Sequence, residues 1–493
     1  MNLFRRQRFC LLLLTLFCTS ASAELLSGEA WLDHVRHDLA PFWYKAAAGV
    51  KEGAFASYLC NDASVPDYQA LVSKSPSLCP ELASAPDWVQ EGFPYQWTRM
   101  VSRQTYAYGV IYHLTGDPRA LELARQGVAF LRSRALLADG DVVGKFSQGK
   151  VADKPDERTS QDLAYAELGM AFYYYLTRDG AVLADIQKIH HHLFAAYKDP
   201  VAERLTWYPA RRQSGQQIEL VSQLDPLNAY MVLLSPILPK AQQEPWREQM
   251  GWLADSIVRD FYFPEEQRFF GYIHDESGRS PDARHADFGH TIKSFWMLYL
   301  VARERNDWRL RQFAEGGMYN ILKRAYREDQ LKNLPLPGPV DEETGRQMVG
   351  WWGDGDGKDG SAWWEYAELD QAAATLGLSS IRTRHYLEKS WPSWFDSFVD
   401  KQHGEVWGWI ASPGEAKVHL WKNGYHTLEH ALIGYLAAQS FGHKPVTLYF
   451  AYPVPTGKEQ PVYYYRGEIV ERHAEGASPS GLPLYRVTAR ELH

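Results

Sequence analysis

Residues 287–300 read DFGHTIKSFWMLYL, and their apolar side chains recur at the spacing of an α-helix. Five of them follow the pattern i, i+3, i+4, i+7 and i+8 and form one stripe: Ile292, Phe295, Trp296, Tyr299 and Leu300. His290, Lys293 and Met297 project from the opposite face. If the stripe packs against an outer layer of helices, this segment is an inner helix. His290 then lies at its N-terminal end and faces the interior.

The same periodicity recurs along most of the chain and predicts an all-α fold. The candidate helices cover residues 29–49, 97–114, 119–134, 160–177, 181–197, 226–237, 243–260, 289–304, 307–326, 363–377, 381–400 and 427–440. Gly116-Asp117-Pro118 and Arg178-Asp179-Gly180 mark two helix ends. Twelve helices in six pairs predict an (α/α)6 barrel. An open helical solenoid is the alternative, but the spacing is too irregular for a repeat array.

The composition is that of a globular protein with an unusual number of aromatic residues. The chain has 493 residues, of which 45% are hydrophobic and 23% charged, and it contains 18 Trp and 29 Tyr. Flat rings with a polar edge are suited to sugar binding, although most aromatics pack in cores. The net charge of −8 and the lack of a basic stripe argue against nucleic-acid binding. No later segment approaches the ~20 apolar residues of a membrane span, so we expect no stable membrane insertion.

Residues 1–23 have the pattern of a cleavable signal peptide. Arg5, Arg6 and Arg8 precede the apolar run 11–17, and the segment ends in Ala21-Ser22-Ala23. Removal of these three arginines takes the net charge from −8 to −11. The pattern predicts a periplasmic or secreted protein.

The mature chain keeps two cysteines, because Cys10 and Cys18 lie in the signal segment. In an oxidising compartment, Cys60 and Cys79 are expected to form a disulfide rather than a metal site, which needs more ligands. Two buried free thiols are the alternative.

The sequence divides into two parts after the signal segment. Residues 24–442 form the expected catalytic barrel. In 443–493 the stretches VTLYFAYP and PVYYYRGEIV alternate like strands and predict a small β-rich extension. The long stretch 331–362 carries Trp351 and Trp352, so we expect a loop that folds over the substrate site.

Two further segments carry polar side chains opposite an apolar stripe. Residues 421–432 read WKNGYHTLEHAL, with His426, Glu429 and His430 off the apolar face. In WWEYAE, Trp364 and Glu368 lie one helical turn apart, which suits a sugar ring stacked beside a carboxylate. An amphipathic helix with solvated acids is the alternative for the second segment. No metal or nucleotide motif occurs in a supporting context, and we expect no cofactor.

These segments resemble a known family. DFGHTIKSFWML resembles the YGHDIE-x-SWLL segment of cellobiose 2-epimerases, WWEYAE resembles WWPQAE, and WKNGYHTLEHAL resembles WKG-x-YH-x-x-R. They occur in the family's order and, with an arginine-bearing helix, extend over most of residues 97–440. The chain therefore resembles the N-acylglucosamine 2-epimerase superfamily. That resemblance implies an (α/α)6 barrel and a cofactor-independent sugar 2-epimerase or aldose–ketose isomerase.

The resemblance also assigns residues to the expected site. It places the two catalytic histidines at His290 and His426. The substrate-binding positions that it implies are Arg103, Asn228, Trp364 and Glu368. Proton removal beside a carbonyl requires a base that works near neutral pH, and histidine is suited to this role. A mono- or oligosaccharide is the implied substrate, and the sequence leaves the oligomeric state open.

Three positions depart from the family pattern. Lys293 replaces a glutamate, Glu429 replaces an arginine and Val232 replaces a histidine. Lys293 is included among the substrate-binding candidates with Trp351 and Trp352. We also consider that Lys293 and Glu429 form an ion pair with exchanged charges.

Two other functions remain compatible with the sequence. A glycoside hydrolase or polysaccharide lyase on the same barrel would use carboxylates such as Asp287, Glu365 and Glu368. A non-catalytic carbohydrate-binding protein would keep the tryptophans without the chemistry.

Overall fold

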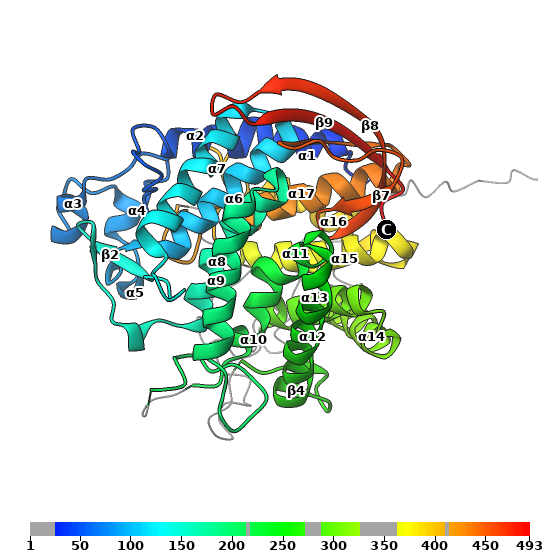
Figure 1. Ribbon diagram of the computed structural model, residues 1–493. Helices are drawn as coiled ribbons and strands as arrows, with labels where there is room; N and C mark the ends of the chain where they lie inside the picture. The colour runs from blue at the N-terminus through cyan, green and yellow to red at the C-terminus, as the bar shows by residue number, and fades with distance from the viewer. Residues whose placement is uncertain (1–24, 213–216, 272–286, 326–361, 410–413) are drawn as a thin grey trace, which may run out of the picture.

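The computed structural model describes residues 25–212, 217–271, 287–325, 362–409 and 414–493, and in these residues the helices form two concentric layers (Figure 1). Each inner segment contacts the next, and the last contacts the first, so the ring is closed. The inner segments are α6 (Thr98–Thr115), α8 (Ser160–Thr177), α10 (Leu220–Pro226) continued by η4 (Leu227–Met231) and α11 (Val232–Leu234), α13 (Phe288–Arg305), α15 (Trp363–Ser379) and α17 (Gly424–Phe441).

The outer layer packs one helical segment against each inner one. Its members are α1 (Gly28–Asp33) with η1 (His34–Leu39) and α2 (Ala40–Ala46), α7 (Pro118–Phe130), α9 (Gly180–Ala196), α12 (Lys240–Ser256), α14 (Trp308–Ala325) and α16 (Arg384–Ser393). The described helices thus confirm the predicted (α/α)6 barrel. The sixth pair joins α1 to α17, so the two ends of the helical region complete the ring.

Short turns extend several of these helices. Wide π-helical turns follow α7, α12 and α16; they are η2 (Leu131–Ala135), η6 (Ile257–Phe261) and η9 (Trp394–Phe398). Single 3₁₀ turns occur at η3 (Pro155–Glu157), η5 (Ser235–Ile237) and η8 (Ile381–Thr383). None of the helices in the described ranges is long and apolar enough to cross a membrane. The expected signal segment lies outside these ranges.

Helix ends form where the sequence analysis placed them. Gly116 ends α6 with a left-handed φ of 74°, and Asp117 caps α7 by accepting a hydrogen bond from the Arg119 backbone N. The second marked end differs in detail. Arg178 itself, and not a glycine, takes the left-handed conformation after α8, with a φ of 59°. Asp179 then caps α9.

The C-terminal segment forms an antiparallel sheet in the order β6-β9-β8-β7. Its strands are β6 (Val446–Phe450), β7 (Glu459–Val462), β8 (Tyr465–Ala477) and β9 (Pro483–Arg490). Figure 1 shows β8 and β9 curving over one end of the barrel. The sheet packs directly on the helices: Tyr112 OH of α6 donates to the Phe450 carbonyl at 2.8 Å, and the Ala451 N donates to the Leu176 carbonyl at 2.8 Å.

One expected strand is two strands in the structure. The stretch PVYYYRGEIV contains a turn at residues 463–464, because Tyr463 adopts a left-handed φ of 56°. The turn separates β7 from β8 and directs tyrosine side chains into the barrel. The Tyr464 hydroxyl donates to the Asn228 carbonyl at 2.9 Å, and Tyr465 OH lies 2.9 Å from Thr375 Oγ1. Alternation alone did not predict this turn, since tyrosine rarely adopts positive φ.

Several short elements were not predicted from periodicity. They are α3 (Tyr68–Ser73), α4 (Pro80–Ala83), α5 (Asp87–Gln90), β1 (Gln96–Trp97), β2 (Lys145–Ser147), β3 (Lys150–Val151), β4 (Tyr262–Phe263) and β5 (Arg268–Phe269). Segments of this length contain too few residues to show a period.

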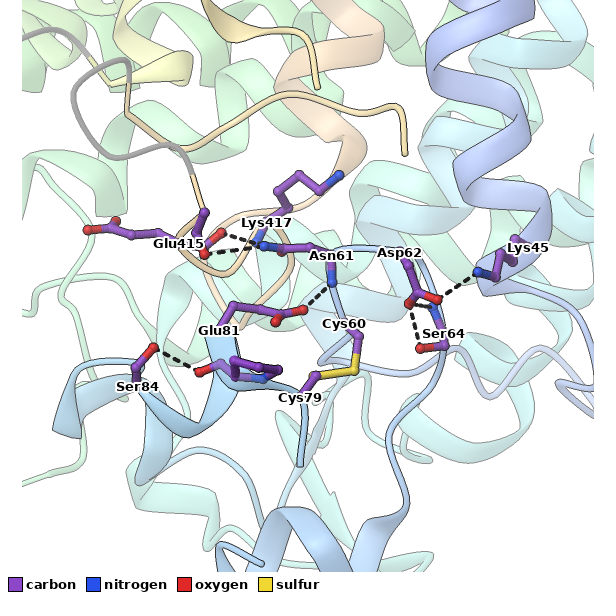
Figure 2. Close-up of a disulfide and its surroundings, with 12 residues drawn as sticks. Lys45, Cys60, Asn61, Asp62, Ser64, Cys79, Glu81, Ser84, Glu415 and Lys417 are labelled. Carbon is purple, nitrogen blue, oxygen red and sulfur yellow. Dashed lines mark hydrogen bonds and ion pairs between the residues drawn. A yellow bond between two sulfur atoms is a disulfide. The ribbon is translucent and has the colours of Figure 1, made fainter. Parts of the chain in front are cut away.

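The predicted Cys60–Cys79 disulfide is present beside α4 (Figure 2). The neighbouring Asn61 connects it to the segment that precedes α17. Its Nδ2 donates to the Glu415 carbonyl at 3.1 Å, and its Oδ1 accepts from the Lys417 backbone N at 2.9 Å. The disulfide therefore links two parts of an irregular segment, and Asn61 connects that segment to the chain that leads to the second histidine helix.

Candidate active site

His290 lies in the first turn of α13, where one acid both caps the helix and contacts the histidine ring. Asp287 Oδ1 accepts a hydrogen bond from the His290 backbone N at 2.5 Å, and Asp287 Oδ2 lies 2.7 Å from His290 Nδ1. A carboxylate can only accept, so we assign the ring proton to Nδ1, which leaves the lone pair of the neutral ring on Nε2. An acid three residues earlier thus orients His290.

Trp364 contacts two histidines that come from different helices. Its ring centroid lies 4.7 Å from that of His290 and 6.0 Å from that of His426. Gly289 permits this approach, because a Cβ atom at that position would lie 2.5 Å from Trp364 Cζ3. Helices α13, α15 and α17 therefore bring His290, Trp364 and His426 together.

Glu368 lies one turn after Trp364 on α15 and contacts two of the other expected residues. Its Oε1 atom is 3.3 Å from Lys293 Nζ and 3.4 Å from His426 Nδ1. The side chains of Glu368 and Lys293 are 0% and 3% exposed. Each histidine thus has a buried carboxylate near its Nδ1 atom: Asp287 for His290 and Glu368 for His426.

Burial and charge set the protonation of this group. Burial lowers the pKa of His426 to about 4 and outweighs the nearby Glu368 carboxylate. Burial alone would lower the pKa of Lys293 and raise that of Glu368. The attraction between the two charges outweighs burial and shifts both pKa values the other way. At neutral pH, a neutral His426 therefore lies beside an ammonium–carboxylate pair.

Glu429 does not form the exchanged ion pair that the sequence suggested. Lys293 pairs with Glu368 and not with Glu429 in the described residues. Glu429 accepts a short hydrogen bond from Tyr463 OH, and Gln371 Nε2 donates to it at 3.4 Å. Tyr463 and Gln371 thus each donate to one oxygen of Glu429, whereas the ammonium of Lys293 lies beside Glu368. Burial, followed by repulsion from Glu368, raises the pKa of Glu429 to about 7.

Arg103 and Asn228 are buried with aromatic side chains of the inner helices. The Arg103 guanidinium stacks 3.9 Å from the Tyr165 ring centroid, and its Nη1 donates to the Trp421 carbonyl at 3.1 Å. Asn228 Nδ2 donates to Tyr425 OH at 2.6 Å. Tyr425 also packs against His426, with 4.5 Å between ring centroids, so Asn228 is linked to the histidine through this tyrosine.

The predicted site is partly outside the described residues. Trp351, Trp352 and the rest of the expected loop 331–362 lie there, and their contact with the site stays a prediction. Val232, which stands where the family has a histidine, is buried on α11.

Sequence reasoning missed two groups that the structure places at the site. Asp287 was considered only as a possible hydrolytic carboxylate, although its position three residues before His290 is that of a helix cap. Tyr463 was read as part of a strand. Three consecutive tyrosines in a C-terminal extension were the available signal.

Three buried side chains of the described residues could together ligate a metal ion. Glu368, His426 and Glu429 each offer one ligand atom, and these atoms lie within 4.8 Å of one another. Lys293 lies 3.3 Å from Glu368 and already supplies positive charge there. A divalent cation would have to overcome that ammonium, so the donor set fits a metal poorly.

Comparisons with known proteins support the fold. The chain matches the structure of cellobiose 2-epimerase from Bacillus thermoamylovorans with a TM-score of 0.63 and 14% identity, over 83% of this chain and 98% of that one. A D-mannose isomerase matches with a TM-score of 0.62 and 14% identity, over 83% and 97%. The chain has an N-acylglucosamine 2-epimerase-like fold.

The same fold also occurs in a hydrolase. An α-1,6-mannanase from a Salegentibacter species matches with a TM-score of 0.52 and 12% identity, over 83% of this chain and 99% of that one. No protein-family model and no curated protein sequence matches the chain. At these identities the similarity establishes architecture, and the reaction must be argued from the residues.

Proposed function

We propose that the protein is a carbohydrate-processing enzyme, specifically a sugar 2-epimerase or aldose–ketose isomerase that uses His290 and His426 for proton transfer and needs no cofactor. The observation that carries the proposal is the arrangement around Trp364. Two histidines contact one indole, and each has a buried carboxylate near its Nδ1 atom. An indole face can stack on a sugar ring and present it to both bases.

The proposed chemistry begins with an open-chain sugar whose carbonyl makes the neighbouring C–H acidic. His426 is neutral at neutral pH, so it can accept this proton and leave an enediolate. His290 acts in its imidazolium form: it has taken up a proton from solvent at Nε2, in addition to the one at Nδ1, and returns the Nε2 proton to the other face of the carbon, which inverts C2. His426 then releases the proton that it accepted to solvent. Asp287 stabilises the imidazolium form of His290, as the buried acid does in other carboxylate–histidine pairs. In the reverse reaction the two histidines exchange roles.

Isomerisation would use the same enediolate. The proton returns to C1 instead of C2, and a ketose forms from an aldose. Arg103 lies near this chemistry and can donate hydrogen bonds to sugar oxygens, while Trp364 binds the ring in the ground state. Replacement of these two residues is therefore expected to raise KM more than it lowers kcat.

A hydrolytic function has less support from the contacts of the carboxylates. An inverting or retaining glycosidase needs a pair of carboxyl groups directed at the glycosidic bond. Here Asp287 contacts His290, and Glu368 contacts Lys293 and His426. Both acids thus interact with a base, which suits proton transfer by histidine better than direct attack by carboxylates.

The deciding experiment is incubation of the purified protein in D2O with a panel of reducing mono- and disaccharides. We expect deuterium at C2, detected by NMR, and loss of this exchange in His290→Ala and in His426→Ala. His37→Ala is the matched control, because that histidine is 74% exposed on the outer layer. Chain cleavage without exchange would instead establish a hydrolase or lyase. Sugar binding without either reaction would establish a binding protein.

We also propose that the protein is exported to the periplasm or beyond. The Cys60–Cys79 disulfide supports this location, since such bonds persist in oxidising compartments. N-terminal sequencing of the protein from a periplasmic extract should begin after Ala23. A cytoplasmic protein that keeps residues 1–23 would refute this proposal.

A further inference from the structure

Two acids with no exposed surface lie close together at the centre of the barrel. Glu368 belongs to α15 and Glu429 to α17, and both are 0% exposed. One oxygen of each lies within 4.8 Å of the other and of a His426 nitrogen. Two carboxylates at this distance in a poorly solvated interior repel each other strongly, so ionising both is unfavourable.

Only one cation pairs with these acids in the described part of the barrel. Lys293 Nζ lies 3.3 Å from Glu368 Oε1 and compensates one negative charge. The other nearby cation, Arg103, stacks on Tyr165 and has no ion pair with either acid. His426 is neutral because burial lowers its pKa to about 4. One carboxylate therefore lacks a counter-charge.

The groups around Glu429 are mostly neutral hydrogen-bond partners. Tyr463 donates to it from the turn between β7 and β8, and Gln371 donates to it from α15. Tyr106 of α6 lies 2.9 Å from Tyr463 through their hydroxyls. Tyr425 of α17 and Tyr464 of the same turn also lie near this acid. These hydrogen bonds favour the carboxylate but supply no compensating charge, and the Tyr463 hydroxyl can also accept a hydrogen bond when Glu429 holds a proton.

We propose that Glu368 and Glu429 share one proton, and that Glu429, held by Tyr463 of the C-terminal sheet, is a positioning residue for His426. When Glu429 holds the proton, Glu368 is the only anion of the pair. Lys293 then neutralises its charge, and His426 faces it. Loss of that proton places a second negative charge beside His426 and disturbs this arrangement. The part of this proposal that concerns His426 rests on the proposed function.

The pair itself can be tested without substrate. Infrared spectra of the full chain, recorded between pH 5 and 9, report the carbonyl stretch of protonated carboxylic acids. We expect a band that disappears with a midpoint near pH 7, the value to which burial raises the pKa of Glu429. In Glu429→Gln this titrating band should be absent. In Tyr463→Phe the midpoint should move to higher pH, because the phenol hydrogen bond that favours the carboxylate is lost.

Glu167→Gln is the matched control for this measurement. Glu167 is another fully buried acid, on α8, and burial raises its pKa well above the ordinary value. Its replacement should remove a separate carbonyl signal and leave the titration of Glu429 in place. A wild-type protein without a titrating carbonyl, or a titration that persists in Glu429→Gln, would overturn the proposal. Stoichiometric binding of added Zn²⁺ that depends on Glu429 would also overturn it, because the cluster would then be a metal site.

The link to His426 needs a separate readout. As the pH rises, the rate of C2 exchange in the wild-type protein should fall, and the midpoint of this fall should be the pH at which the carbonyl band disappears. That fall should be absent in Glu429→Gln, because the amide imitates the protonated acid at every pH. An identical pH dependence in both proteins would refute the positioning role. If the carbonyl titrates and no sugar exchanges deuterium, the proposed function fails while the proton-sharing pair stands.

Discussion

Replacement of Lys293 by methionine tests the electrostatic balance of the barrel directly. Methionine keeps most of the apolar length of the lysine side chain and removes the ammonium. The packing of α13 against α15 is therefore largely retained. Glu368, which is 0% exposed, loses the cation that lies 3.3 Å from its Oε1 atom. The variant thus isolates the cost of a buried carboxylate without its partner.

The expected loss is about 3–5 kcal/mol in the free energy of unfolding at pH 8, the range found when one partner of a buried ion pair is removed. The loss should shrink toward pH 5. In the wild-type protein the pKa of Glu368 is lowered relative to the unfolded chain. The ionised Glu368 therefore stabilises the fold at pH values above the pKa that it has in the unfolded chain. This contribution is lost as the pH falls through the pKa that it has in the folded protein. Without Lys293, burial raises this pKa instead. Stability is then lost as the pH rises.

The assay is urea unfolding of the full chain at pH 8 and pH 5, followed by tryptophan fluorescence. Lys293→Met combined with Glu368→Gln should be more stable at pH 8 than Lys293→Met alone, because residue 368 then no longer carries a buried charge without a partner. Lys45→Met is the control, since Lys45 and Asp62 form an exposed pair at 2.9 Å and are expected to contribute at most about 1 kcal/mol. A Lys293→Met protein within about 1 kcal/mol of the wild type at pH 8 would refute this reasoning.

Three further predictions follow from the described contacts. Gly289→Ala should lower the free energy of unfolding by about 1–3 kcal/mol, because the added methyl group overpacks against Trp364. Gly316→Ala lies in open space on α14 and should raise this free energy by up to about 1 kcal/mol in the same urea assay. Replacing Cys60 and Cys79 by serine should cost about 3 kcal/mol for a closed loop of this length, seen as a lower melting temperature; an unchanged value would contradict it. Asp287→Asn should slow C2 exchange by about 10²–10⁴-fold with KM little changed, and exchange at the wild-type rate would rule out its orienting role.

The sequence determined the helical architecture because helix formation depends on local patterns. The stripe that begins at Ile292 predicted α13, and Gly116-Asp117-Pro118 predicted the boundary between α6 and α7. These signals depend on residues within a few positions of one another, where backbone geometry and capping act. The positions of His290 and His426 at two helix starts were also visible in the sequence.

The partners of the charged residues were decided by the tertiary structure. The sequence suggested that Lys293 pairs with Glu429, but the ring of inner helices places its ammonium beside Glu368. The turn at Tyr463 between β7 and β8 then brings a hydroxyl to Glu429, and the strand-like alternation of that segment did not indicate it. Ion pairs and buried hydrogen bonds depend on distances between side chains that are remote in sequence. Only the closure of the barrel sets those distances, and they decide which acids are charged, which hold a proton and which histidine each one faces.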